Sequence, residues 1–354
     1  MFSQLSRIQS LFKLVQTPLV GMDVGSSTIK LLELSCNQGT YQVEAYANTS
    51  IPSSDTPASP IQEAVFDVVR KATTQRKFAA LCISGPTVIT RVFQVNANFT
   101  DEEIVEQLEL EADHYIPYPL EEVLYDFYID RNAEDHSNLS EVVLVAARRE
   151  CVESCLDALS LSGLKASILD VDRFVMERAF KLILNQLGEQ AIVQNTAVID
   201  LGASVTTLHI FKNARSIYAR DQTFGVKQLM NEIERRYGLS NRDAMDLVKY
   251  GGLPEDYHDE ILQPFKEVVT RQISHALQIF FSSSEESAIQ SLVLAGGGAC
   301  LSGLGEYVEE KMGIKTCIAN PFAEMQISSN LDKNRVMEEA PALMKSVGLA
   351  LRNF

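Results

Sequence analysis

Residues 22–29 have the sequence MDVGSSTI, and residues 199–206, half a chain later, have the related sequence IDLGASVT. Each stretch follows a short apolar run and leads into an alternating pattern, which is typical of a strand, a tight turn and a second strand. In each copy an aspartate ends the first strand and a glycine stands in the turn. A single hairpin of this kind is common. Two copies half a chain apart predict a duplicated α/β unit whose two carboxylates face one cleft.

Length and charge limit the class of protein. A chain of 354 residues is too long for one simple core, so two lobes are expected. The formal net charge of −16 argues against nucleic acid as a partner, because phosphate binding needs a basic surface. The same charge argues against adsorption on an anionic bilayer, so membrane contact is expected to be indirect.

The cysteines and the apolar runs indicate the compartment. The six cysteines stand singly without a C-x-x-C motif, and the five histidines show no zinc-ligand spacing, so we expect reduced thiols in a cytoplasmic protein. The sequence contains no run of about 18 apolar residues, so no membrane span is predicted. Apolar residues recur at near-helical spacing from Phe2 to Val15, which leaves two interpretations of residues 1–18: a frayed leader, or an amphipathic helix that docks on protein or membrane.

Strands alternate with helices along the rest of the chain, which indicates an α/β fold. Residues 78–165 lie between the two hairpins and carry strands and helices of their own, so we interpret them as an inserted subdomain. The remaining residues are divided into an N-terminal leader (1–18), lobe I (19–77 with 166–195 and 340–354) and lobe II (196–339).

The tips of the two hairpins suit phosphate. A glycine-tipped turn presents several backbone N–H groups to an anion and forms a concave nest for phosphate oxygens. Lys30 is placed to reach back to a phosphate as a point charge. Asp23 and Asp200 would face a magnesium ion, directly or through water. Either hairpin alone is equally consistent with an ordinary turn. The expected phosphate contacts are Gly25, Ser26, Ser27, Gly202, Ala203 and Ser204.

A third glycine-rich segment follows a buried strand. Residues 292–299 have the sequence LVLAGGGA, in which Gly296, Gly297 and Gly298 come directly after the apolar residues. Consecutive glycines allow the backbone to approach a flat or phosphorylated ligand closely. By itself such a turn often reflects packing alone. The three segments together, in this order, indicate a nucleotide site.

The order of these segments resembles that of the actin, heat-shock chaperone and sugar kinase superfamily: first phosphate loop, second phosphate loop, adenosine loop. Within it the bacterial FtsA branch is most similar, because residues 294–304, LAGGGACLSGL, resemble its adenosine segment. Residues 245–249, MDLVK, look like the segment whose acid and lysine line the nucleoside pocket, which assigns that role to Asp246 and Lys249. The resemblance implies an actin-like ATPase fold with two duplicated lobes, an FtsA-like inserted subdomain, and ATP bound between the lobes.

The inserted residues 78–165 indicate which family of this superfamily the chain resembles most. Residues 109–123, ELEADHYIPYPLEEV, resemble the signature of the PilM family, cytoplasmic actin-like proteins of type IV pilus assembly, and residues 346–352, SVGLALR, also fit. The YIPYP stretch would in addition end a helix, since proline restricts the residue before it.

Membership would imply an ATP-binding component of the inner-membrane assembly platform, with roles in pilus biogenesis and twitching motility. The inserted subdomain would then help to form a groove for the cytoplasmic N-terminal tail of the membrane protein PilN. Through that tail the chain would reach the inner membrane and relay its nucleotide state to the machinery. The assembly motor ATPases and a second copy of the chain, as dimer or filament, are further candidate partners.

The resemblance also bears on hydrolysis. Members that hydrolyse ATP carry an acid or amide on the helix between the phosphate loops, where it orients the attacking water. That register assigns the role to Asp172, with Asp170 as a competitor, although an aspartate at a strand-to-helix junction often serves only as an N-cap. Ala203 and Ser204 replace two glycines of the chaperone pattern, which limits backbone freedom near the terminal phosphate. We therefore expect ATP binding with slow or absent hydrolysis, so that ATP acts as a conformational ligand.

Two other functions remain as alternatives. One is a small-molecule kinase of the same superfamily, but no segment indicates a dedicated acceptor site. The other is an FtsA-like, filament-forming cell-division protein. FtsA ends in a linker and an amphipathic membrane helix, whereas this chain ends at Phe354, which argues against that role and leaves polymerisation open.

Overall fold

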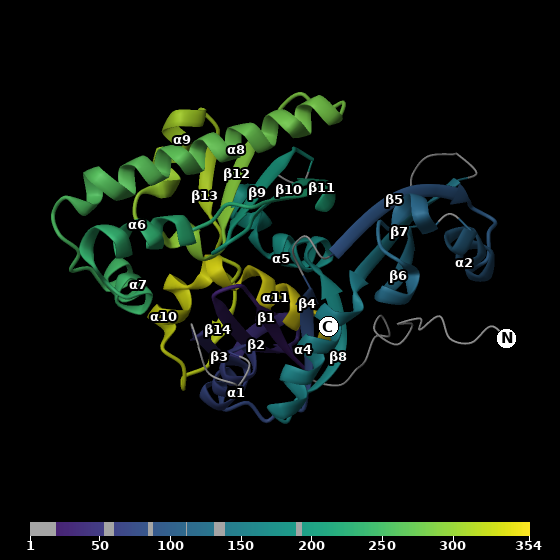
Figure 1. Cartoon of the computed structure of the whole chain (residues 1–354), viewed down its shortest axis with the longest axis horizontal. Helices are drawn as coiled ribbons and strands as arrows, with labels where there is room; N and C mark the ends of the chain where they lie inside the picture. Colours follow the sequence, from purple (N-terminus) through teal and green to yellow (C-terminus); the bar gives the residue numbers. More distant parts are fainter. Residues whose placement is uncertain (1–18, 53–59, 84–87, 111, 131–138, 189–192) are drawn as a thin grey trace.

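The computed structural model describes residues 19–52, 60–83, 88–110, 112–130, 139–188 and 193–354 (Figure 1). Three sheets organise these residues. The predicted N-terminal leader, residues 1–18, lies outside the described residues. Among the helices of the described ranges, none combines the length and the apolar character needed to cross a lipid bilayer.

The first predicted hairpin forms the centre of a six-stranded sheet. The Gly25 N–H donates to the Thr28 carbonyl at 3.0 Å and closes the turn between the two antiparallel strands. Two further strands continue the sheet in parallel beside the first strand of the hairpin. In spatial order the strands are β14 (Gln326–Ile327), β3 (Thr40–Ser50), β2 (Thr28–Asn37), β1 (Leu19–Val24), β4 (Phe78–Ile83) and β8 (Lys165–Val171).

The second hairpin forms the centre of a five-stranded sheet. Its strands, in spatial order, are β11 (Arg215–Gln222), β10 (Thr206–Lys212), β9 (Thr196–Leu201), β12 (Ser291–Ala295) and β13 (Lys315–Ile318). This order repeats β3-β2-β1-β4-β8 strand by strand, with an antiparallel meander followed by two parallel strands. The predicted duplication of an α/β unit is therefore confirmed.

A third, antiparallel sheet lies apart from the other two in the view of Figure 1. It consists of β5 (Val88–Asn96), β7 (Leu139–Arg148) and β6 (Val123–Asp130), and it packs with α2 (Asp101–Leu110) around a small core of its own. The short helix α3 (Ala112–Tyr115) ends just before Ile116 and Pro117, as the YIPYP stretch predicts. The turn η1 (Leu120–Glu122) then leads into β6.

The bounds of this inserted unit differ from those expected from the sequence. β4 pairs in parallel with β1 inside the first sheet, although residues 78–165 were expected to be the insert. The helix α4 (Arg149–Leu161) buries Val152 and Leu159 in the same cluster as Val65 of α1 (Pro60–Ala72). Only residues 88–148 therefore carry the separate sheet. Likewise β14, expected in lobe II, pairs with β3 of the first sheet.

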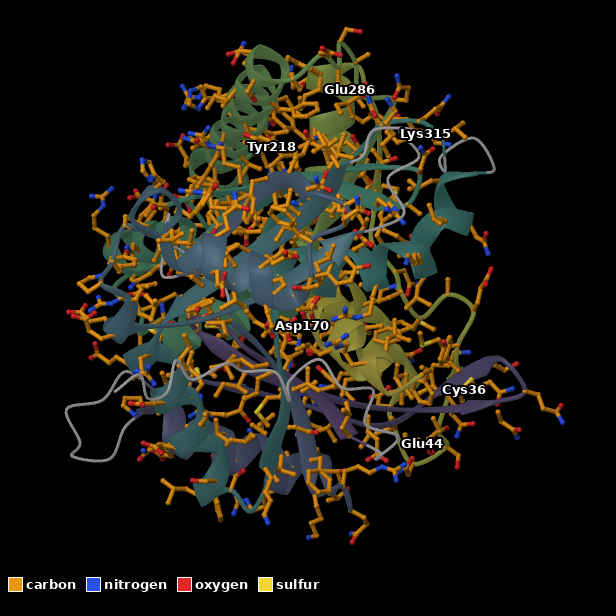
Figure 2. All side chains as sticks on the ribbon, turned by 90° about the vertical axis from the view of Figure 1, so that its right-hand side faces the viewer. Cys36, Glu44, Asp170, Tyr218, Glu286 and Lys315 are labelled. Carbon is orange, nitrogen blue, oxygen red and sulfur yellow. The ribbon has the colours of Figure 1, made fainter. Side chains whose placement is uncertain are left out.

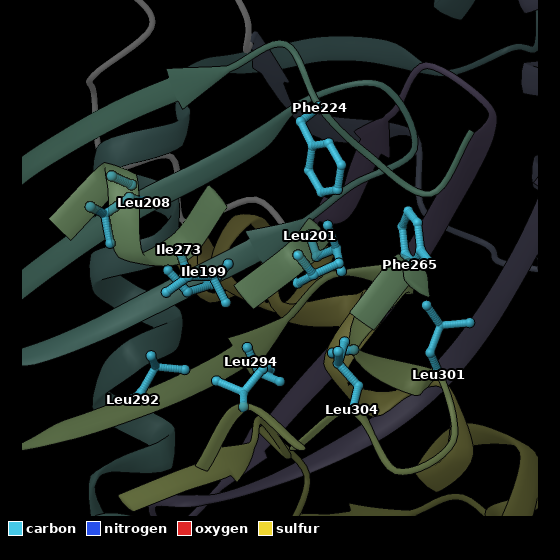
Figure 3. Packing of buried hydrophobic residues seen from close by; sticks show 14 of the residues in the cluster. Ile199, Leu201, Leu208, Phe224, Phe265, Ile273, Leu292, Leu294, Leu301 and Leu304 are labelled. Atoms are coloured by element: carbon cyan, nitrogen blue, oxygen red, sulfur yellow. The ribbon is translucent and has the colours of Figure 1, made fainter. Parts of the chain in front are cut away.

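The core of the second lobe forms between its sheet and the long helix α8 (Gln263–Ser283). In α8 the buried residues recur every three or four positions, which places them on one face of the helix. Figure 3 shows Ile273 of α8 among Ile199 and Leu201 of β9 and Leu294 of β12. Other helical segments of this lobe are α6 (Lys227–Tyr237), α7 (Asn241–Tyr250), the π-helical turn η3 (His258–Leu262), the 3₁₀ turn η4 (Gly297–Cys300) and α9 (Leu304–Met312).

A short helix, α11 (Met344–Ala350), lies in the middle of the molecule, between the first sheet and α5 (Asp172–Leu187) (Figure 1). It packs by backbone contact on both sides. A Cβ added to Gly21 of β1 would overlap the Ser346 carbonyl, and a Cβ added to Gly348 would overlap the Val175 carbonyl of α5. The turn η5 (Ala340–Leu343) and α10 (Lys333–Glu338) precede α11, and η6 (Leu351–Asn353) follows it.

Candidate functional site

The two hairpin tips, far apart in the sequence, meet across the lobes. The Ser26 hydroxyl of the first tip donates to the Ser204 hydroxyl of the second at 3.2 Å. The second tip repeats the closure of the first, because the Gly202 N–H donates to the Val205 carbonyl at 3.1 Å. A Cβ on Gly202 would lie 2.5 Å from that carbonyl oxygen, so the turn requires glycine. The structure thus brings together the residues that the sequence assigns to the two phosphate loops.

The hairpin tips are also anchored to their surroundings through backbone carbonyls. The Ser27 carbonyl accepts from the Ile51 N–H at 2.8 Å, and the Ala203 carbonyl accepts from the Lys227 N–H at the start of α6 at 2.9 Å. These contacts tie each tip to a neighbouring segment of its own lobe and satisfy its backbone carbonyl.

Asp23 and Asp200, each the last residue but one of its strand, are both buried and both paired with a lysine. Asp23 Oδ2 lies 3.1 Å from Lys30 Nζ on the neighbouring strand. Asp200 Oδ2 lies 2.7 Å from Nζ of Lys345, a residue of α11. Lys30 was expected to reach back to a phosphate, and here it reaches back to Asp23.

Asp172, the predicted water-orienting residue, occupies the first turn of α5 and faces the same centre. Its Oδ1 lies 2.8 Å from Lys345 Nζ, and its Oδ2 lies 3.3 Å from Nε2 of His209 on β10. Burial alone would raise the pKa of Asp172, but Lys345 and His209 more than offset this and hold the pKa well below its ordinary value. The Asp172 side chain therefore forms an ion pair with Lys345 and a contact with His209 of the other lobe, and it is not a helix cap, since the N-cap position belongs to Val171.

The competing residue, Asp170, has a different setting. It lies in β8 near the middle of the molecule, beside the yellow α11 in Figure 2. Its carboxylate forms an ion pair with Arg178 and lies 3.2 Å from Arg352 Nε. Both arginines stand on elements that pack around α11, so Asp170 holds the helices of the first lobe together.

The sequence analysis does not identify two residues of this charged centre, Lys345 and His209. Lys345 is the single charged residue in the apolar stretch 340–351, APALMKSVGLAL, and His209 is fully buried in the strand TTLHIFK. A lone charge in a buried helix needs a partner, so the stretch itself held a signal. What it could not indicate is which residues would be the partners, since Asp172 lies in the same lobe as Lys345 and Asp200 in the other.

The glycine-rich turn after β12 packs against the second hairpin. A Cβ on Gly296 would lie 2.5 Å from Asp200 Oδ1, and its φ of +80° also favours glycine. A Cβ on Gly298 would overlap the Leu201 side chain. Gly297, between them, is exposed, and a Cβ added there would meet no atom within 4 Å. Two of the three glycines therefore serve packing, and the third presents open backbone.

Lys249 of α7 is paired with Glu339, which follows α10 at the edge of the first lobe. Glu339 also accepts from the Asn48 side chain and lies 3.7 Å from Arg335 Nε. Burial raises the pKa of the Glu339 carboxyl to about 7, although the contact with Lys249 and the nearby Lys30 both favour its ionised form. Asp246, one helical turn before Lys249 on α7, is exposed.

No ligand set for a metal ion stands ready in this centre. Within the described ranges, the structure contains no group of three or more histidine, cysteine, aspartate or glutamate side chains placed to hold a metal. The two predicted magnesium ligands, Asp23 and Asp200, each contact an ammonium group instead. They fit a hydrated magnesium ion held through water better than one coordinated directly.

Solved structures show the same architecture. A chain from the "PilM-PilN type IV pilus biogenesis complex" is 26% identical, with a TM-score of 0.80 over 96% of this chain and 99% of that one. The ethanolamine utilization protein EutJ from Carboxydothermus hydrogenoformans is 15% identical, with a TM-score of 0.53 over 98% of this chain and 93% of that one. A diol dehydratase-reactivating factor in nucleotide-free form is 12% identical, with a TM-score of 0.50 over 95% and 99%.

The likeness to EutJ and to the reactivating factor concerns the fold, which is the actin-like ATPase fold. The likeness to the protein of the pilus complex extends over almost all of both chains. The family described as "Type IV pilus assembly protein PilM" matches residues 21–354, which include both hairpins, the inserted sheet and α11. The chain thus belongs to the PilM family of actin-like type IV pilus assembly proteins.

Proposed function

We propose that this chain binds ATP with magnesium between its two lobes, binds the cytoplasmic N-terminal tail of PilN, and relays its nucleotide state to the pilus assembly platform at the inner membrane. The observation that carries the nucleotide part is the contact of Ser26 with Ser204 at 3.2 Å. This contact supports the proposal because it joins the tips of the two glycine-closed turns, whose remaining backbone N–H groups would then face one anion.

Each part of a nucleotide has matching residues. Lys30, which contacts Asp23 at 3.1 Å, would add a positive charge beside the phosphates. The residues that would hold the phosphates are those of the two tips, Gly25, Ser26, Ser27, Gly202, Ala203 and Ser204. The open backbone at Gly297, together with Asp246 and Lys249 of α7, would line the nucleoside. Asp23 and Asp200 would hold magnesium through its water shell, and the ion would neutralise phosphate charge there.

The setting of Asp172 supports slow or absent hydrolysis. A residue that orients water needs a free acceptor oxygen aimed at the terminal phosphate. Both Asp172 oxygens instead face a cation or an imidazole, Lys345 at 2.8 Å and His209 at 3.3 Å. We therefore propose ATP as a ligand that favours the closed arrangement of the lobes.

The PilN part is supported by the likeness to a protein solved in a PilM-PilN complex and by a hollow beside the inserted sheet. This hollow, of about 650 Å³, lies between η1 and helices α1 and α4, where the inserted unit joins the first lobe. Its lining is mostly acidic and therefore suits a tail with lysine or arginine. The lining residues are Gln62, Glu121, Glu122, Arg148, Arg149, Glu150, Glu153 and Asp157.

Nucleotide binding is tested by calorimetry with Mg-ATP. Asp23→Ala and Asp200→Ala each remove a carboxylate from a hairpin, and we expect both to weaken binding about tenfold or more. Glu286→Ala, far from the tips and near the surface, is the matched control and leaves binding unchanged. Unaltered affinity in both aspartate variants would sink the assignment of the phosphate loops.

Binding of PilN is tested with a synthetic peptide of its N-terminal tail. The double variant Glu122→Lys/Glu153→Lys reverses two charges in the acidic hollow, and we expect it to weaken peptide binding about tenfold or more. The control Glu309→Lys/Glu310→Lys makes the same charge change on α9 of the other lobe. Equal loss in both variants would show a general charge effect and place the groove elsewhere.

A further inference from the structure

Lys345 is fixed in place by backbone packing. The helix α11 that carries it contacts β1 at Gly21 and α5 at Gly348, where only glycine leaves room. Its neighbours Met344 and Ser346 are 1% and 0% exposed, so the helix cannot turn without opening the core. The Lys345 side chain, 15% exposed, is thereby directed to the point where the two lobes meet.

The charges that face Lys345 come from three elements and from both lobes. Asp172 of α5 lies 2.8 Å away and Asp200 of β9 lies 2.7 Å away. Asp23 of β1 acts on it at longer range. The Lys345 ammonium thus forms direct, charge-assisted contacts with two carboxylates at once, which compensate its positive charge within the site.

A second buried group closes this centre on the far side. His209, 0% exposed, has its Nε2 3.3 Å from Asp172 Oδ2, and within the described part of the chain neither ring nitrogen has a hydrogen bond of good geometry. The imidazole comes from the second lobe and the carboxylate from the first. With the bridge from Asp172 through Lys345 to Asp200, two separate polar contacts join the lobes at the phosphate site.

We propose that Lys345 is a built-in cation of the phosphate site, which joins Asp172 to Asp200 before nucleotide binds and keeps magnesium off these carboxylates until phosphate is present. This proposal rests on the proposed nucleotide site for its place in the function, but it concerns the nucleotide-free protein. An ammonium is a compact point charge that satisfies two carboxylates, and its charge repels a divalent cation from the same oxygens.

The test measures Mn²⁺ binding by electron paramagnetic resonance on the full chain without nucleotide. Lys345→Met keeps an unbranched side chain of similar length and removes the charge, which leaves Asp172 and Asp200 facing each other. Because magnesium-type ions are held by one or two carboxylates and several waters, we expect this variant to bind Mn²⁺ at least about tenfold more tightly than the wild type. We also expect its melting temperature to rise with Mg²⁺ concentration, which the wild type does not show.

Two variants serve as controls. Lys345→Arg keeps the positive charge and should bind Mn²⁺ as weakly as the wild type. Lys212→Met removes an equal charge from the pair with Glu286, where Lys212 is 40% exposed, and should also leave Mn²⁺ binding unchanged. Tight Mn²⁺ binding by the wild type, or no gain in Lys345→Met, overturns the proposal.

If Lys345→Met does not fold, Lys345→Met/Asp172→Asn decides the matter, because it removes one charge of each sign. We then expect the double variant to fold and to bind Mn²⁺ no more tightly than the wild type. Failure of the double variant to fold would overturn the proposal, since Lys345 would then act through packing and not through its charge. A wild type that does not bind ATP in separate calorimetry would refute the proposed nucleotide site and leave the Mn²⁺ result standing.

Discussion

Among single residues, Asp172 carries the clearest dependence on pH. Its pKa lies below the ordinary 3.8 in the folded protein because Lys345 and His209 outweigh the effect of burial. The folded state therefore binds this proton less tightly than the unfolded state does. The resulting stabilisation is fully present above about pH 4 and is lost as the pH falls toward the folded pKa.

We expect Asp172→Asn to lower the free energy of unfolding by about 2 kcal/mol at pH 7. The gap between wild type and variant should be constant above about pH 4 and should shrink as the pH falls below that value, because the unfolded wild type then takes up a proton on Asp172 that the folded state does not bind. Urea denaturation at a series of pH values measures this gap. A gap that is constant across the series would show that the Asp172 charge does not contribute to stability.

Substitutions of the glycines after β12 should distinguish a packing role at Gly296 from a ligand-binding role at Gly297. Gly296→Ala should lower the free energy of unfolding by about 2 kcal/mol or more. The φ of Gly296 is +80°, and an added Cβ would lie 2.5 Å from Asp200 Oδ1, so both the backbone and the space exclude a side chain. Gly297→Ala should change stability by less than about 0.5 kcal/mol, since its Cβ meets no atom. It should nevertheless weaken ATP binding, because the methyl group would occupy the space beside the open backbone that is proposed to face the nucleoside. Thermal unfolding and ATP titration of the two variants would measure these effects, and normal ATP binding by Gly297→Ala would contradict the assignment.

The residues around the phosphate site show where sequence reasoning succeeds and where it stops. Gly25 and Gly202 could be predicted because a tight turn leaves a local signature of aspartate, glycine and serine. Lys345 stands out as a lone charge in an apolar stretch, but the sequence does not show that its partners, or that of His209, lie on other elements of the chain. Lys30 was found, but its contact with Asp23 depends on strand register.

For whole elements, the position of α11 depends on two glycines, Gly21 of β1 and Gly348 of α11 itself. A methyl group on Gly348 would overlap the Val175 carbonyl, and neither helix backbone can shift without disturbing the core. We expect Gly348→Ala to destabilise the fold by about 3 kcal/mol.

The matched control is Gly305→Ala in α9, where the added Cβ would lie 3.2 Å from the flexible end of Ile318. Alanine is the better helix former, so this change should be neutral or stabilising by up to about 1 kcal/mol. Chemical denaturation of both variants gives the comparison. Similar effects at the two positions would show that α11 tolerates movement.

Element boundaries were the weaker part of the sequence prediction. The strands and helices of each lobe followed from apolar periodicity, as in α8, where the buried face repeats along the helix. The periodicity of β4 says only that the strand is buried, not which sheet it joins, and so it was grouped with the insert. The two residues of β14 are too few to form any pattern.

For the whole molecule, nucleotide binding and stability are linked. A ligand that binds only the folded state at a hundred times its Kd raises the free energy of unfolding by about 2.7 kcal/mol. We expect Mg-ATP at that excess to give this increase in the wild type. Asp200→Ala, which loses the hairpin carboxylate and the pair with Lys345, should show less than half of it at the same ATP concentration. Thermal unfolding with and without Mg-ATP provides the measurement, and equal stabilisation of both proteins would contradict a site between the hairpins.

The pairing of β14 with β3 and the placement of α11 have a consequence for how the protein is made. Leu32, Leu34 and Val43 of the first sheet pack against Phe322, Val336 and Val347, near the other end of the chain. During translation, the first strands of this sheet therefore leave the ribosome long before the residues that cover this face. The core of the second lobe, in contrast, forms from residues that lie close together in the chain. The lobe that is synthesised first is completed last, and its exposed apolar face is where nascent chains would need a chaperone.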